Sequence, residues 1–221
     1  MQENPKRNNF LVYEILAVVI VVIISIVIIY SIVPTSASSA LQKFIKTVPS
    51  GVTVYSANNS IVISGSNVTI PMVAYENLSY NPVHNITYPT NITAANSYLQ
   101  TPNHELPYFM DYGLIDPTLI IHKGSTVNFV FINFASEVHI FAISPDGPPF
   151  NPFTTLSPEA LKSDLLYLPA LPPPQNFKNP FSGSIYSVAG SYTFNATGTY
   201  YYLCPIPGHA ELGMWGEIKV V

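Results

Sequence analysis

The sequence is poor in charge and in cysteine. Only 9% of its 221 residues are charged, against about 25% in an average soluble protein. Eight Lys and Arg against 12 Asp and Glu give a formal net charge of −4, so no basic surface exists to neutralise phosphates and we expect no nucleic-acid partner. The single cysteine, Cys204, excludes an internal disulfide, a four-cysteine zinc site and a dinuclear copper centre bridged by two thiolates.

The abundant residues favour an all-β fold. The chain has 21 Pro, 15 Tyr and 12 Phe, which suit strands and the loops that connect them. Two longer stretches, 76–105 and 144–182, are predicted to be loops or insertions, with a helical turn around 157–168. Ten runs have the length or alternation of strands and together predict a sandwich or barrel: 52–55, 61–64, 68–74, 117–121, 126–134, 138–144, 185–189, 191–195, 199–204 and 216–221.

One long uncharged run precedes these strands. Nineteen residues from Ile15 to Val33 carry no charge, and a helix needs about 20 apolar residues to cross the hydrocarbon layer. A cleaved signal peptide is the alternative, because Lys6 and Arg7 precede the run and small residues follow it at 36–40. Signal-peptide cores have only about 7–15 apolar residues. We therefore predict a retained N-terminal transmembrane helix over residues 13–33.

Glycosylation motifs indicate on which side of the membrane the rest of the chain lies. All six Asn-x-Ser/Thr motifs follow the uncharged run, and glycan acceptors belong on exported surfaces. We predict a cytoplasmic N-terminus over 1–12, a linker over 34–47 and a domain over 48–221 on the exterior face of the cell membrane. The candidate N-glycan sites are Asn58, Asn67, Asn77, Asn85, Asn91 and Asn195.

The C-terminal run places three soft or borderline ligands at intervals of five residues. They are the thiol of Cys204, the imidazole of His209 and the thioether of Met214. Two His nitrogens, one Cys sulfur and a weak axial Met form the ligand set of a mononuclear blue copper centre. His139, in the apolar run 138–144, is the best candidate for the second imidazole.

The other histidines and other chemistries fit the sequence less well. His84, His104 and His122 are interpreted as ordinary loop or surface residues. A Cys-His nucleophile needs an activating base and a third orienting group, which a hairpin with an axial-type Met does not offer. Four protein ligands leave no open position for a substrate, so we expect a carrier and not an enzyme. A copper storage or delivery protein and a structural glycosylated surface protein remain alternatives.

Several strings resemble one known family. The run from Tyr201 to Val220, the segment Asp116-Pro-Thr-Leu-Ile-Ile-His-Lys-Gly-Ser-Thr-Val and the string Asp146-Gly-Pro-Pro-Phe resemble the rusticyanins and, more distantly, the membrane-anchored sulfocyanins. These are type 1 blue copper proteins of the cupredoxin family from acidophiles. The resemblance implies a Greek-key β-sandwich over 48–221. Residues 76–100 resemble an insertion.

The resemblance also implies a site and a function. It places the ligands of one type 1 copper ion on His139, Cys204, His209 and Met214. It implies single-electron transport between respiratory partners such as a cytochrome or a terminal oxidase complex. Ile140 stands where the family usually has Asn or Ser, so only its backbone N–H is expected to reach the thiolate.

The resemblance to acidophile proteins agrees with the composition. Ten Asp and Glu and six Lys and Arg follow the uncharged run, so protonating the carboxylates removes few ion pairs. The apolar neighbours of His209 are expected to disfavour its imidazolium form. The His209 ring itself is expected to reach the surface. There it would be surrounded by a small apolar docking patch for a redox partner, formed by Pro205, Ile206, Pro207, Ala210 and Leu212.

Overall fold

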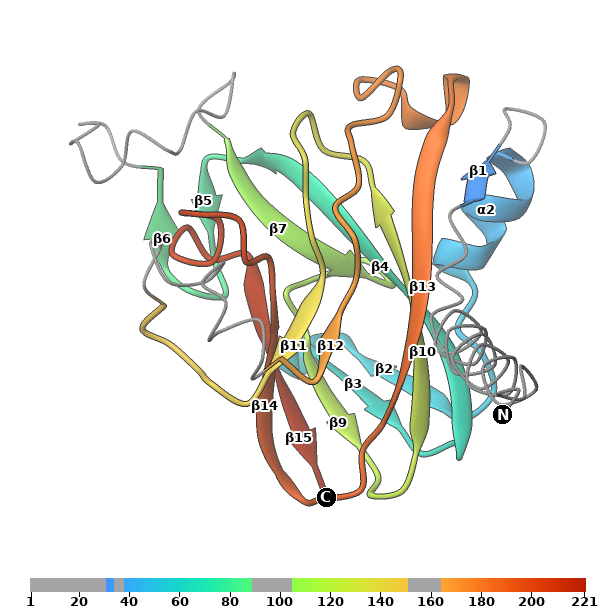
Figure 1. Cartoon of the computed structure of the whole chain (residues 1–221), viewed down its shortest axis with the longest axis vertical. Helices are drawn as coiled ribbons and strands as arrows, with labels where there is room; N and C mark the ends of the chain where they lie inside the picture. Colours follow the sequence, from blue (N-terminus) through green and yellow to red (C-terminus); the bar gives the residue numbers. More distant parts are fainter. Residues whose placement is uncertain (1–30, 34–37, 89–104, 151–163) are drawn as a thin grey trace, which may run out of the picture.

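Two β-sheets face each other in the computed structural model, which describes residues 31–33, 38–88, 105–150 and 164–221 (Figure 1). One sheet has seven strands. In spatial order they are β12 (Leu166–Tyr167), β11 (Ala142–Ser144), β14 (Gly198–Leu203), β15 (Trp215–Val220), β9 (Thr118–Ile121), β3 (Ser60–Ile63) and β2 (Val52–Tyr55). β9 pairs in parallel with both β15 and β3, which brings the C-terminal strand to the centre of the sheet.

The second sheet has six strands, and a separate hairpin lies near one end of the sandwich (Figure 1). In spatial order the six are β1 (Ser31–Val33), β13 (Ile185–Thr193), β10 (Thr126–Asn133), β4 (Asn67–Leu78), β7 (Leu106–Asp111) and β8 (Leu114–Ile115). The hairpin consists of β5 (Tyr80–Asn81) and β6 (Ile86–Thr87). The other elements are the helix α2 (Ser38–Lys46) and two 3-10 turns, Ser56–Asn58 and Pro180–Ser182. The predicted β-sandwich is thus confirmed.

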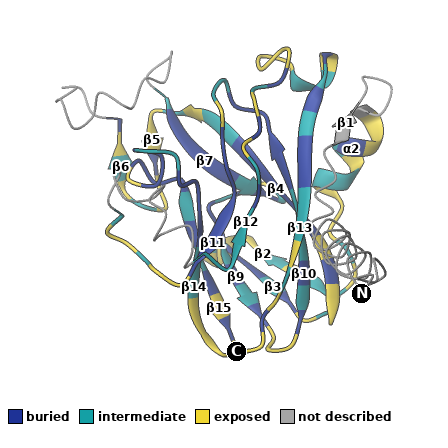
Figure 2. Cartoon of the chain, viewed as in Figure 1, coloured by how far each residue is buried: buried dark blue, intermediate teal, exposed yellow. Residues whose placement is uncertain are grey.

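The core lies between the sheets and follows from alternation along the strands. In β10, Val127, Phe129 and Phe131 are fully buried on one face, as a strand with every second residue directed inward requires. The rings of five residues interlock with centroids 5.2 to 6.2 Å apart, namely Phe109, Phe129, Phe131, Phe141 and Tyr202. Figure 2 shows the buried residues along the facing strands and the exposed ones at the turns.

Cys204 and Met214 belong to this same core cluster. Both side chains are fully buried, and they lie where β14 ends and β15 begins. The predicted ligand loop is therefore attached to the rigid centre of the molecule at both of its ends. This attachment fixes the positions of its side chains before any metal binds.

The segment before the sandwich contributes the short helix α2. Leu41 of α2 packs in a second apolar cluster that includes Val73, Ile132 and Ile185. Among the described residues no helix combines the length and apolar character needed to cross a membrane. Residues 13–30 of the predicted transmembrane helix over 13–33 lie outside the described residues. The last three, Ser31–Val33, form strand β1, which pairs with β13, and not a helix.

Three sequence predictions about elements need correction. Residues 138–144 do not form one strand, because only Ala142–Ser144 is regular and His139 makes an isolated bridge with Leu171. The two strands predicted over 185–189 and 191–195 are one, Ile185–Thr193. Of the helical turn expected around 157–168, residues 157–163 lie outside the described residues, and β12 occupies its end.

Candidate metal centre

The ligand loop is a hairpin whose two ends are tied together. The Cys204 backbone N–H donates to the Met214 carbonyl at 3.1 Å, and the Met214 N–H donates to the His209 carbonyl at 3.0 Å. The His209 N–H in turn donates to the Ile206 carbonyl at 3.0 Å. The last pair in the ladder between β14 and β15 is Leu203 with Trp215. The loop backbone therefore fixes Cys204, His209 and Met214 relative to one another.

His139 reaches the same place from a different part of the chain. Its backbone N–H and C=O pair with Leu171 at 3.1 and 2.8 Å. Buried Asn133 supports this bridge, because its Nδ2 donates to the carbonyls of Glu137 at 2.7 Å and of Leu171 at 3.0 Å. Its Oδ1 accepts the Ala135 N–H at 2.9 Å. Asn133 thus shapes the turn that carries His139.

Three of the predicted ligands come together in a buried triangle. Cys204 Sγ lies 3.4 Å from His209 Nδ1 and 3.8 Å from His139 Nδ1, and the two nitrogens are 3.1 Å apart. Such separations suit donors that share one ion at bond lengths of about 2.0–2.3 Å, the range for imidazole and thiolate on zinc. The exposed fraction is 0% for His139 and Cys204 and 3% for His209. The donor set is soft and dry, as a copper site requires.

The protonation states of the two imidazoles differ. Burial, assisted by the nearby His209, lowers the pKa of His139 well below its usual range, so the ring is neutral as a metal ligand must be. Burial also lowers the pKa of His209, but Cys204 and Glu137 raise it to about 9. Burial of His209 thus acts in the expected direction, but the interactions with Cys204 and then with Glu137 outweigh it, and the sequence argument included neither of them.

Glu137 is a neighbour of the site that the sequence analysis missed. Its Oε2 lies 3.5 Å from His209 Nε2, on the side of the ring opposite to Cys204. The only sequence signal for it is its position two residues before His139. The carboxylate places a negative charge close to the metal centre.

The Cys204 sulfur also accepts a backbone hydrogen bond. The Ile140 N–H donates to Sγ at 3.4 Å, so the expectation that the backbone replaces a polar side chain at this position is confirmed. A hydrogen bond to a thiolate stabilises its charged form. Residue 140 thereby retains a contact with the sulfur despite its apolar side chain.

The ligand loop is more buried than the sequence predicted. His209 does not reach the surface, and Pro205, Ala210 and Leu212 are buried with it. Only Ile206 and Pro207 of the expected docking patch are partly exposed. The other predicted ligand, Met214, is fully buried at the base of the loop.

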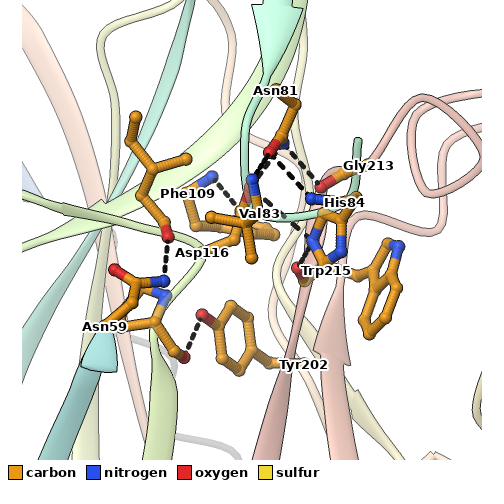
Figure 3. Close-up of polar contacts among 11 residues, drawn as sticks. Asn59, Asn81, Val83, His84, Phe109, Asp116, Tyr202, Gly213 and Trp215 are labelled. Atoms are coloured by element: carbon orange, nitrogen blue, oxygen red, sulfur yellow. Dashed lines mark hydrogen bonds and ion pairs between the residues drawn. The ribbon is translucent and has the colours of Figure 1, made fainter. Parts of the chain in front are cut away.

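The remaining histidines lie outside the triangle. His122 is exposed after β9, and His104 lies outside the described residues. His84 stacks on Trp215 with ring centroids 4.0 Å apart, and its Nε2 lies 2.8 Å from the Trp215 carbonyl oxygen. The region predicted to be an inserted loop therefore touches the ligand loop through the β5–β6 hairpin, a contact that no local motif indicated (Figure 3).

Comparison with known proteins agrees with this geometry. A family model described as the sulfocyanin (SoxE) domain matches residues 117–221. Rusticyanin of Acidithiobacillus ferrooxidans is 36% identical over 121 residues, which are 54% of this chain and 70% of that protein. Rusticyanin of Acidithiobacillus ferridurans is 34% identical over 121 residues, covering 58% of its length.

A solved structure shares the fold. The structure of rusticyanin from Thiobacillus ferrooxidans aligns with a TM-score of 0.56 at 24% identity, covering 87% of this chain and 97% of that one. The cluster of His139, Cys204 and His209 fits a type 1 copper site. The chain therefore belongs to the rusticyanin and sulfocyanin family of cupredoxins, the blue copper proteins.

Proposed function

We propose that the protein is a membrane-anchored, exported blue copper protein that carries single electrons between respiratory partners in an acidophile. The observation that carries this proposal is the buried triangle of His139, Cys204 and His209. Copper bound there would supply one-electron chemistry by alternating between Cu(I) and Cu(II). The three side chains would bind the ion, and Met214 would supply a weak thioether ligand.

The residues around the triangle favour electron transfer over copper exchange. The three ligand side chains are at most 3% exposed, so a competing chelator has no direct access to them. The loop ends are tied by backbone hydrogen bonds, which limit rearrangement when the charge of the ion changes. Storage or delivery of copper would need the opposite properties, namely accessible and adaptable ligands.

The test is the stability and reversibility of the blue state. We expect the oxidised, copper-loaded protein to keep its intense colour under mild chelation and to accept and return one electron repeatedly. His139→Ala should abolish this behaviour, whereas His122→Ala, at an exposed position, should leave it unchanged. Rapid loss of copper to the chelator from the unmodified protein would instead support storage or delivery.

The anchor and the exterior location rest on the sequence. The uncharged run of nineteen residues before the domain supports a membrane helix, and all five described sequon asparagines are exposed. Removal of residues 1–30, which leaves strand β1 of the sandwich in place, should release the copper domain from membranes prepared from producing cells. Enzymatic deglycosylation of the native protein should lower its mass. Retention of the truncated chain on membranes would contradict the anchor, and an unchanged mass would contradict the glycans.

The partners are proposed to be redox proteins such as a cytochrome or a terminal oxidase complex. Weak electron-transfer encounters use small interfaces, and the partly exposed Ile206 and Pro207 lie within the ligand loop. Reduction of a purified candidate partner by the Cu(I) protein would identify such a pair.

A further inference from the structure

The β5–β6 hairpin contacts the segment that carries Met214 on both sides of this residue. Three consecutive carbonyl groups of the segment each accept a hydrogen bond. The Gly213 oxygen lies 3.5 Å from Asn81 Nδ2, and the Trp215 oxygen lies 2.8 Å from His84 Nε2. The Met214 oxygen between them accepts from the backbone of Cys204 at 3.1 Å. The two outer contacts come from the hairpin (Figure 3), and the central one comes from the ligand loop.

The hairpin occupies a place where the sheet offers no strand partner. β15 begins at Trp215, but its pairing with β9 begins only at Ile218. The His84 side chain therefore donates to a carbonyl of β15 beyond the end of that ladder. A carbonyl oxygen can only accept, so His84 Nε2 carries a proton, and burial lowers the pKa of the ring, which favours its neutral form.

Asn81 holds the hairpin turn in a fixed position. Its side chain is fully buried, and its Oδ1 accepts the backbone N–H groups of Val83 at 2.9 Å and of His84 at 3.3 Å. Its Nδ2 donates to Asp116 Oδ2 at 2.9 Å, while Asp116 Oδ1 accepts the Phe109 N–H at 2.8 Å. The turn is thus attached to β7 in the body of the sandwich (Figure 3).

The ligand segment packs closely against the hairpin. A Cβ atom on Gly213 would lie 3.1 Å from Asn81 Nδ2, 3.2 Å from His84 Cδ2 and 3.3 Å from Ile86 Cδ1. The indole of Trp215 is covered by the His84 ring at an interplanar angle of 23°. Both backbone neighbours of Met214 are therefore fixed by the hairpin.

We propose that Asn81 and His84 are positioning residues that set how closely the Met214 thioether approaches the copper. This inference rests on the proposed copper site. An axial thioether bond is weak and long, so its length follows the position of the main chain that carries it. The two imidazoles and the thiolate are positioned by other contacts, those of Asn133 and of the ligand loop itself.

Loss of the hairpin contact should therefore change the axial interaction selectively. A Met214 segment released from His84 can move away from the metal, and a weaker axial donor stabilises Cu(II) less than before. We expect His84→Ala to raise the reduction potential and to alter the EPR spectrum of the oxidised protein, while the thiolate-to-copper absorption band remains. His84→Gln keeps a side-chain N–H donor and should restore both properties toward those of the unmodified protein.

The control lies in the same hairpin. Tyr80 is exposed, and its hydroxyl donates within the hairpin, to Asn85 Oδ1 at 2.8 Å. Tyr80→Phe should leave the potential and the EPR spectrum unchanged. The measurements are voltammetry, EPR and thermal unfolding of the full copper-loaded chain, with Asn81→Ser as a second variant should His84→Ala fail to fold.

The outcomes separate this inference from the proposed function. A blue protein whose potential and EPR spectrum are the same in His84→Ala as in Tyr80→Phe would overturn the positioning role alone. The positioning role would also be overturned if the reduction potential changed in parallel with the melting temperature across all variants and if His84→Gln did not restore the potential of the unmodified protein. An unmodified protein that shows no thiolate-to-copper band with copper would refute the proposed function itself.

Discussion

Met214 is the residue whose role can be tested by changing a single ligand atom. Met214→Gln replaces a soft sulfur by a harder oxygen donor, which stabilises Cu(II) relative to Cu(I). The reduction potential should therefore fall, and a tenfold change in relative affinity corresponds to about 59 mV for one electron. Voltammetry measures it, with Met110→Gln on β7, a partly exposed methionine, as the control. An unchanged or raised potential would show that Met214 does not bind the metal.

Glu137 provides a second test at the scale of a residue. Its carboxylate lies 3.5 Å from His209 Nε2, and a negative charge near the site favours the more positive Cu(II) state. Glu137→Gln should raise the reduction potential by tens of millivolts, because the imidazole ring separates the carboxylate from the ion and unit charges about 8 Å apart near a protein surface interact by about 2 kcal/mol. Glu217→Gln, whose carboxylate pairs with Lys219, is the matched control. An equal response of both variants would contradict a specific role for Glu137.

The site residues differ in how much of their role could be predicted. The intervals between Cys204, His209 and Met214 are local, so the sequence displays them directly. The position of His139 was predicted, but the bridge to Leu171 that holds it joins residues far apart in the chain. The contacts of Asn81 and His84 with the ligand segment span more than one hundred residues, and no periodicity or motif encodes such a contact.

At the scale of elements, the β5–β6 hairpin and the ligand loop depend on a glycine between them. Gly213 has φ of +97°, and a Cβ atom there would lie only 3.1 to 3.3 Å from three hairpin atoms, whereas Gly113 has φ of +83° and open space around it. Gly113→Ala should lower the free energy of unfolding by about 1–2 kcal/mol, the cost of holding a residue with a Cβ atom in the left-handed conformation. Gly213→Ala should cost more in the free energy of unfolding and should also alter the EPR spectrum.

Chemical denaturation of the two copper-loaded glycine variants measures this difference. Both glycines have a similar positive φ, so the backbone cost of alanine should be similar at the two positions. Any larger loss in the free energy of unfolding for Gly213→Ala therefore reports contact between the added Cβ atom and the hairpin. Equal costs and unchanged spectra in both variants would mean that the hairpin does not press on the ligand segment.

Strands were predictable where burial alternates and unpredictable where a glycine serves packing. The run 126–134 alternates, and it forms Thr126–Asn133 as predicted. Gly190 suggested a break between two strands, yet it lies inside Ile185–Thr193. A Cβ atom there would lie 2.5 Å from Leu168 Cδ2, so this glycine admits a neighbouring side chain. The sequence pattern does not distinguish a glycine that breaks a strand from one that allows close packing.

At the scale of the whole molecule, buried carboxyl groups make stability depend on pH. Burial raises the pKa of Asp111 and Asp116 well above the usual range and that of Asp164 to about 6. Such groups stay protonated in the folded chain at pH values where the unfolded chain has lost the proton. The contribution of these carboxyl groups to the free energy of unfolding should therefore fall as pH rises from about 4 through their folded pKa values. This direction agrees with the proposed acidic habitat.

Asp111→Asn tests the pH dependence. The amide is neutral at every pH, so the loss of stability between pH 4 and pH 7 should be smaller in this variant than in the unmodified protein. Glu217→Gln, whose carboxylate pairs with Lys219 at the surface, should leave the loss unchanged. Denaturant unfolding at both pH values measures the effect. A pH dependence that Asp111→Asn does not reduce would exclude this buried carboxyl as its source.

The central claim is that the buried triangle of His139, Cys204 and His209 holds a type 1 copper ion. The most direct measurement is the visible absorption spectrum of the copper-loaded, oxidised protein and of its Cys204→Ala variant, with circular dichroism to establish that both are folded. We expect an intense thiolate-to-copper band in the unmodified protein and none in folded Cys204→Ala. A band of the same intensity in the variant, or no band in the unmodified protein, would contradict the type 1 copper assignment.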